Sequence, residues 1–234
     1  SQEWTYRTLS FMSFELQALC EHKCEADRLQ VLNEYFFKNK CFQIQPHTME
    51  LQACDLLIKP VLTQKAGCCL PVSMVYLHLS SVLDLPIHLI HANNHYLLKW
   101  VRVGKSCYID LNQNGYILNE QQMAQILQKS MEPGKEPPQL DVLPARLILT
   151  RYIQDVIRVY EREKQDDALH IALNILLKLE PNLLTALAKR ASVRRRLSLT
   201  KEALIDLKRY FSFVEFNQAQ IGRASCRERV SSPV

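Results

Sequence analysis

The sequence has 234 residues, of which 47% are hydrophobic, and it contains no run of 18 or more apolar residues. This composition predicts a globular protein with a buried core, and it argues against a membrane-spanning helix. The first ten residues lack the regions of a signal peptide, and the eight cysteines follow no regular spacing, so we expect a reduced, cytoplasmic protein.

The positive charge is concentrated near the C-terminus. Residues 182–234 hold 11 Lys/Arg and 4 Asp/Glu, against 18 and 20 in the rest of the chain. Five of the basic residues form a cluster on one helical pattern: Lys189, Arg190, Arg194, Arg195 and Arg196. Because no aromatic residues are interleaved with them, we expect a solvated helix face and no nucleic-acid site.

The first half of the chain is predicted to begin with helices. Apolar residues recur at helical spacing over residues 14–37, and again over residues 49–62, where Pro60 is expected to interrupt the helix. Residues 70–85 show the pattern of a long buried helix with Pro71 in its first turn. This pattern places Cys69 at a helix N-terminus.

Three short segments after this helix are rich in apolar and aromatic residues. They cover residues 87–92, 95–103 and 107–112, and a turn at residues 103–106 joins the last two. Such segments predict an antiparallel sheet. We expect no parallel strands, and no strands beyond residue 150.

A proline-rich segment at residues 131–144 contains four of the ten prolines and predicts a linker. Helical patterns follow at residues 152–160, 167–179, 183–197 and 200–211, and their short connections predict antiparallel helix pairs. The expected domains are therefore residues 1–130 and 145–215. Residues 216–234 show neither helical nor strand period and are expected to be a disordered or foreign tail.

The residue types of a nucleophilic triad occur in order along this pattern. A helix N-terminus lowers the pKa of a cysteine, so we expect a reactive thiolate at Cys69. His95 opens a strand, and Asp110 ends the next one across a short turn. On such a pair of strands the two residues are paired or diagonal neighbours, close enough for a carboxylate to hold an imidazole.

Each of the three residues also has a structural interpretation. Cysteine is a common buried apolar residue, and His95 could be a residue at the rim of the sheet. Asp110 could simply accept hydrogen bonds within its turn. Only the order of the three residues and their expected elements favours a catalytic site.

At these residues the sequence resembles a known fold. The run "GCC" before a helix ending in "LDLP", followed by "HYLLKW" and "YIDLN", is similar to the transglutaminase-like fold. Residues 56–118, the preceding run "RLQVLNEYFF" and the later helix pairs resemble the SirB1 family, which joins a transglutaminase-like core to tetratricopeptide-type (TPR) repeats. The resemblance covers about residues 27–211.

The resemblance implies an α+β fold: a papain-like or transglutaminase-like core over residues 1–130, with a helix packed on an antiparallel sheet. An all-α TPR-like domain of helix pairs would follow at residues 145–215. Pro181, Ala191 and Ala203 fall at TPR-like positions, whereas Leu169 stands where a small residue is expected.

Carried over residue by residue, the resemblance makes Cys69 the nucleophile, His95 the base and Asp110 the orienting acid. SirB1-like proteins often read Gly-Asn-Pro where this chain has Gly67-Cys68-Cys69, so family membership alone does not imply activity. Cys68 leaves the position of the nucleophile ambiguous by one residue.

Two functions follow from these observations. The first is a cysteine-dependent enzyme that acts on an amide of a protein or peptide by acyl transfer or hydrolysis. The second is a regulatory protein that binds a protein or peptide through the same cleft and the TPR repeats. Neither function needs a cofactor, and the sequence contains no phosphate-binding loop. Cys20, His22 and Cys24 are not followed by a second ligand pair at zinc spacing, so no metal site is expected.

Overall fold

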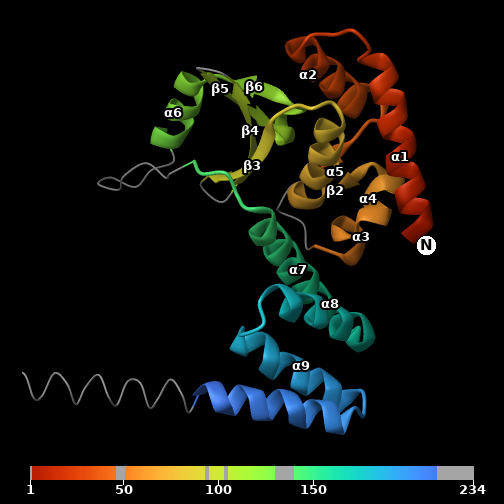
Figure 1. Cartoon of the computed structure of the whole chain (residues 1–234), viewed down its shortest axis with the longest axis vertical. Helices are drawn as coiled ribbons and strands as arrows, with labels where there is room; N and C mark the ends of the chain where they lie inside the picture. The colour runs from red at the N-terminus through yellow and green to blue at the C-terminus, as the bar shows by residue number, and fades with distance from the viewer. Residues whose placement is uncertain (1, 46–50, 93–94, 103–104, 130–139, 215–234) are drawn as a thin grey trace, which may run out of the picture. The chain divides into compact units, whose positions relative to one another are not determined.

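The computed structural model describes residues 2–45, 51–92, 95–102, 105–129 and 140–214 (Figure 1). The chain folds into two units, residues 1–148 and residues 149–234. The first unit combines helices with a small sheet, and the described residues of the second unit are helical.

The first unit begins with three helical segments, α1 (Gln2–Leu19), α2 (Glu25–Asn33) and a π-helix, η1 (Glu34–Asn39). Helix α1 starts well before the expected residue 14. The sequence pattern missed this start because the first two turns of the helix bury no side chain and show no apolar spacing. In η1, the ring of Phe36 stacks on Phe42 with centroids 4.3 Å apart and meets Tyr76 edge-on at 5.2 Å. These rings join η1 to the strand that follows it and to the central helix.

The second expected helix is divided into α3 (Ala53–Leu56) and α4 (Ile58–Gln64). The break lies at Leu57, which has an extended backbone, and not at Pro60, which sits in the first turn of α4 where its missing N–H costs no hydrogen bond. Lys65 then ends α4 in a left-handed conformation (φ 57°). The expectation of a helix interrupted at Pro60 was therefore wrong in position.

Two short strands lie on either side of these helices. Strand β1 (Gln43–Ile44) pairs with β2 (Ala66–Gly67) in parallel, contrary to the expectation that the fold has no parallel strands. Two-residue strands have no alternation to detect, so this pairing could not be found from a sequence pattern. The pair fixes the chain immediately before the central helix.

The central helix α5 (Cys69–Val82) confirms the predicted helix, and its first residue is Cys69. Nine of its side chains are buried, because it contacts α1, α2 and α4 as well as the sheet. Tyr76 and Leu79 are fully buried at 0% exposure. Helix α5 therefore forms the core of the first unit.

The main sheet has four antiparallel strands in the order β3 (Ile87–Ala92), β4 (His95–Arg102), β5 (Lys105–Asp110) and β6 (Tyr116–Leu118). The first three are the predicted strands, and Arg102 pairs with Lys105 at the predicted turn, whose residues 103 and 104 lie outside the described part. Strand β6 and the helix after it, α6 (Glu120–Lys129), were not predicted.

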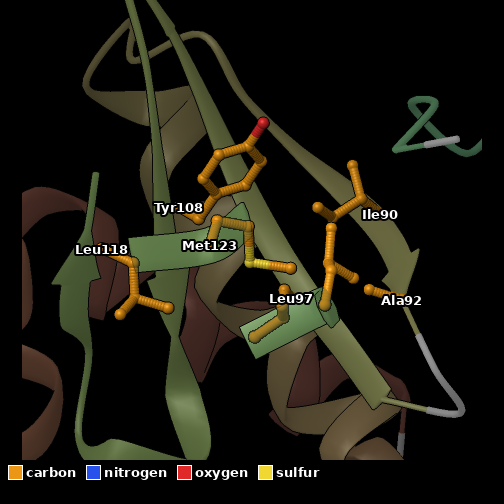
Figure 2. Close-up of a cluster of buried hydrophobic side chains, with 7 residues drawn as sticks. Ile90, Ala92, Leu97, Tyr108, Leu118 and Met123 are labelled. Atoms are coloured by element: carbon orange, nitrogen blue, oxygen red, sulfur yellow. The ribbon is translucent and has the colours of Figure 1, made fainter. Parts of the chain in front are cut away.

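Helix α6 covers a cluster of buried side chains on the sheet (Figure 2). Met123 and Leu127 of α6 pack against Ile90, Leu97 and other strand residues. The far end of the proline-rich segment lies along β3: Val142 bridges to Ile90, and the N–H of Leu143 donates to the carbonyl of Leu89 at 2.8 Å. One face of the sheet and its β3 edge thus contact later parts of the chain.

The helices of the second unit confirm the predicted pattern. Helices α7 (Ala145–Arg162), α8 (Asp166–Leu179) and α9 (Leu184–Arg196) are followed by a helix whose described part is residues 200–214. Helix α8 packs on α9. Ala191 and Ala203, the two small residues of the predicted helix contacts, are buried at 4% and 6% exposure.

The basic cluster of the second unit is not the solvated face that we expected. Arg190 and Arg194 both bind the carboxylate of Asp206, at 2.6 Å and 2.8 Å, and Asp206 is only 2% exposed. Two further basic residues pair with acids on other helices: Lys189 with Glu161 at 2.6 Å, and Arg196 with Asp166 at 2.7 Å. The partners lie 12 to 30 residues away along the chain, so the local charge pattern could not reveal them.

In the part of the chain that is described, no helix is both long and apolar enough to cross a membrane. The predicted tail at residues 216–234 lies outside the described residues.

Candidate functional site

Cys69 is held at the first position of α5 by the chain segment before it. Cys68 is the N-cap residue, and its N–H donates to the carbonyl of Asp55 at 2.8 Å. A Cβ atom at Gly67 would lie 2.5 Å from a methyl of Val61 and 2.8 Å from the same Asp55 carbonyl, so only glycine fits this approach. The segment before Cys69 is therefore closely packed against α3 and α4.

The thiol of Cys69 points into a polar but enclosed environment. Its Sγ atom lies 3.7 Å from the backbone oxygen of Tyr96 on β4 and 3.8 Å from Oγ of Ser73, one turn along α5. The hydroxyl of Ser73 itself donates to the carbonyl of Cys69 at 2.7 Å. Cys69 is only 2% exposed, so a reactant must displace protein atoms to reach the sulfur.

Asp110 ends β5 and forms the N-cap of a short 3-10 helix, η2 (Leu111–Gln113). Its Oδ1 accepts the backbone N–H of Asn112 at 2.9 Å and the Asn112 side-chain amide at 3.3 Å, and its Oδ2 accepts from Gln113 Nε2 at 2.9 Å. The carboxylate therefore does accept hydrogen bonds within its turn, as the structural interpretation of this residue predicted.

His95 is the first residue of β4, where it pairs with Ala92 of β3. Its side chain lies outside the described part of the structure. Leu98 pairs with Ile109, so the register places Asp110 opposite Leu97, two residues from His95. At the level of the backbone, the two residues are the diagonal neighbours that the sequence predicted.

The structure brings the three predicted positions together at one end of the sheet. The sulfur of Cys69 contacts the backbone of Tyr96, the residue that follows His95. The negative charge of Asp110 is close enough to raise the pKa of the Cys69 thiol. The sulfur of Cys69 therefore faces β4 and the turn that follows β5.

The pKa of Cys69 is opposite to our expectation. Burial is the largest cause and raises the pKa to about 11; hydrogen bonding to Ser73 lowers it, and the charge of Asp110 raises it further. The helix N-terminus favours a thiolate, but the cost of moving that charge out of water is greater. The resting form at pH 7 is therefore the neutral thiol.

Sequence reasoning missed two side chains of this site, Ser73 and Asn112. Ser73 is four residues after Cys69, which is the spacing of neighbours on one helix face, so this signal was available. The amide of Asn112 lowers the pKa of Cys69 by hydrogen bonding and also donates to Asp110. Asn112 reaches the site only because η2 turns back after β5, which no local pattern shows.

Among the side chains that the structure describes, which do not include that of His95, no group of three His, Cys, Asp or Glu could hold a metal ion. None of the seven cysteines in the described ranges forms a disulfide bond. Cys24 donates its thiol hydrogen to Asp27 Oδ2 at 3.1 Å, while Cys20 is buried.

Comparison with known proteins identifies the fold of this region. A family model described as the transglutaminase-like superfamily matches residues 3–154. The matched region includes α5 with Cys69 and the strands that carry His95 and Asp110. A search of curated proteins found no match. Since the matched residues make up more than half of the sequence, the chain belongs to the transglutaminase-like superfamily.

Proposed function

We propose that this protein is a cysteine-dependent enzyme that attacks an amide of a protein or peptide, with Cys69 as nucleophile, His95 as base and Asp110 as orienting acid. The observation that supports this proposal best is the position of the Cys69 sulfur, 3.7 Å from the backbone oxygen next to His95 and within the electrostatic influence of Asp110. Superfamily membership over residues 3–154 supports the same assignment.

The raised pKa of Cys69 determines the order of the chemical steps. A neutral thiol must lose its proton as it attacks, so His95 takes the proton while the sulfur bonds to the amide carbon. The carbon–nitrogen bond then breaks, and the imidazolium returns the proton to the leaving amine. Water or a second amine attacks the thioester, releases the acyl group and restores the thiol. The carboxylate of Asp110 would stabilise the transient imidazolium charge.

A non-catalytic interaction role is the second candidate, and two observations favour it. Cys69 is buried with a raised pKa, as an inert structural cysteine would be. The Asp110 carboxylate also has hydrogen-bond donors within its own turn. In this case the same cleft would bind a protein or peptide without cleaving it.

The finer assignment to the SirB1 family is also part of this proposal. It is supported by the motifs around Cys69, His95 and Asp110 and by the helices of the second unit. The TPR-like character of residues 145–215 is supported by the buried Ala191 and Ala203 at the predicted helix contacts. A cytoplasmic location is supported by the described cysteines, which form no disulfide bonds.

An activity assay separates the two candidate functions. Purified protein is incubated with peptides that contain glutamine, with and without a primary amine, and released ammonia and cleaved peptide are measured. We expect turnover that Cys69→Ser reduces by at least about 10³-fold, whereas Cys68→Ser retains it. Peptide binding without turnover in the wild-type protein would instead support the interaction role.

A further inference from the structure

A cavity of about 650 Å³ lies in the first unit between the N-terminal helices and the main sheet. Its apolar walls come from α2, η1, the chain at the start of β1, and strands β4 and β6: Leu29, Phe37, Phe42, Trp100 and Ile117. This volume falls within the range of about 300–1,000 Å³ that is typical of ligand-binding pockets. One wall contains a π-helix, a distortion that often marks functional sites.

The chemistry of the walls favours an uncharged apolar group. The indole N–H of Trp100 donates to Glu25 at 3.0 Å, so this donor already has a hydrogen-bond partner within the protein. The two charged residues of the lining, Glu34 and Lys38, pair with each other at 3.5 Å and leave no net charge. The uncharged polar residues of the lining are amides, including the exposed Gln30 and Gln43.

Amide side chains beside an apolar cavity match a peptide. They can exchange hydrogen bonds with backbone N–H and C=O groups, while an apolar side chain enters the cavity. Phosphorylated or strongly charged ligands do not fit, because the lining offers them no unpaired charge.

The cavity shares its supporting structure with the Cys69 site. Asn33 lines the cavity, donates to the carbonyl of Gly115 at 3.0 Å and accepts from Tyr76 of α5 at 2.6 Å. Gly115 in turn donates its N–H to the carbonyl of Asp110 at 2.9 Å. Gly115 has a φ of +77°, and a Cβ there would lie 2.5 Å from Asn33, so this contact requires glycine.

A second residue of the lining, Gln43, is also connected to the site. Gln43 pairs with Ala66 in the β1–β2 ladder, and the next pair, Ile44 and Gly67, lies directly before Cys68 and Cys69. The segments that hold Cys69 and Asp110 in place are therefore bonded to residues that line, or directly adjoin, the cavity.

We propose that this cavity receives an aromatic or branched aliphatic side chain of a peptide or protein substrate whose amide is attacked at Cys69. This inference rests on the proposed function and names the class of substrate for the same site. Substrates with an apolar residue near the target amide are preferred to those with charged residues there.

The test uses heptapeptides with a central glutamine, flanked by phenylalanine, lysine or glutamate, and calorimetric titration into full-length Cys69→Ser protein. We expect the phenylalanine peptide to bind at least about tenfold more tightly than the two charged peptides. Ile117→Glu should remove this preference. Val101→Glu is the matched control, because Val101 is 39% exposed and Ile117 40%, and Val101 does not line the cavity.

Two outcomes separate this inference from the proposed function. Equal binding of all peptides, or equal effects of Ile117→Glu and Val101→Glu, would overturn the assignment of the cavity even if the wild-type protein turns peptides over. If Ile117→Glu removes the preference but the wild-type protein shows no turnover, the cavity is supported as a peptide site and the catalytic role of Cys69 is contradicted.

Discussion

Cys69 in the first unit and Asp206 in the second unit are each 2% exposed, yet their surroundings differ in charge. Asp206 lies between the guanidinium groups of Arg190 and Arg194. Cys69 lies near a hydroxyl, a backbone carbonyl, an amide and the carboxylate of Asp110. Equal burial therefore has different results in the two units. In the second unit the charge of Asp206 is matched by two opposite charges, whereas in the first unit burial keeps the thiol of Cys69 neutral.

This difference shows how the two regions should be interpreted. The basic residues of the second unit were expected to form a solvated helix face, but four of the five are used in ion pairs that join helices. The polar residues around Cys69 are not ion-paired with the thiol, and they converge on it from α5, β4 and η2. Ion pairs thus account for the second cluster, while the first is the site of the proposed chemistry.

The largest effect is expected from removing the buried acid of the second unit. Asp206→Ala leaves Arg190 and Arg194 with unmatched charge, and we expect it to lower the free energy of unfolding by about 3–5 kcal/mol. Urea unfolding measures this change. Glu161→Gln, which breaks only the more exposed pair with Lys189, is the control and should cost less than about 1 kcal/mol. Equal costs for the two variants would contradict the comparison.

Alkylation tests the neutral thiol of the first unit. At pH 8 we expect iodoacetamide to modify the exposed Cys24 and Cys41 at least about 100-fold faster than Cys69, because the pKa of Cys69 is raised to about 11. The rate at Cys69 should rise as the pH approaches that pKa. Peptide mapping by mass spectrometry measures the modification of each cysteine.

In urea, where the chain is unfolded, all the cysteines should react at similar rates. Preferential labelling of Cys69 in the folded protein at pH 8 would show that the thiol is not held neutral. Such labelling would support the lowered Cys69 pKa that the helix N-terminus alone predicts.

A smaller effect distinguishes two neighbouring basic residues of α9. Arg194→Glu places a negative charge against Asp206 and removes hydrogen bonds to a charged group, so we expect a loss of about 1.5–3 kcal/mol in unfolding free energy. Arg195→Glu is the matched control at an exposed position and should change it by less than about 0.5 kcal/mol. Similar stability of both variants would support the solvated face that the sequence suggested.

Except for α6, the sequence predicted those elements that have a strong period of their own. The helix after Cys69 and the strands on either side of residues 93–94 carry long apolar patterns, and the structure confirms them. The starting residue of α1, the parallel β1–β2 pair and strand β6 were not predicted. Their residues bury few side chains or pair over only two or three residues, so they depend on tertiary contacts.

The candidate site was predicted in its positions but not in its electrostatics. The placement of Cys69 at a helix start and Asp110 at a strand end follows from local pattern. The depth of burial of Cys69 follows from how α5 packs on β4 and η2, which the sequence does not show. For the same reason Asn112 and the cavity beside Trp100 could be found only from the structure.

The most direct test of the central claim is to trap the covalent intermediate. The phenylalanine-flanked glutamine heptapeptide is incubated with the wild-type protein, the reaction is stopped with acid, and the intact protein and its fragments are analysed by mass spectrometry. For attack on the glutamine side chain, we predict an adduct with the mass of the peptide less one ammonia, located at Cys69 and retained in Cys68→Ser. An adduct at Cys68, or product formation by Cys69→Ser at the wild-type rate, would contradict the claim that Cys69 is the nucleophile.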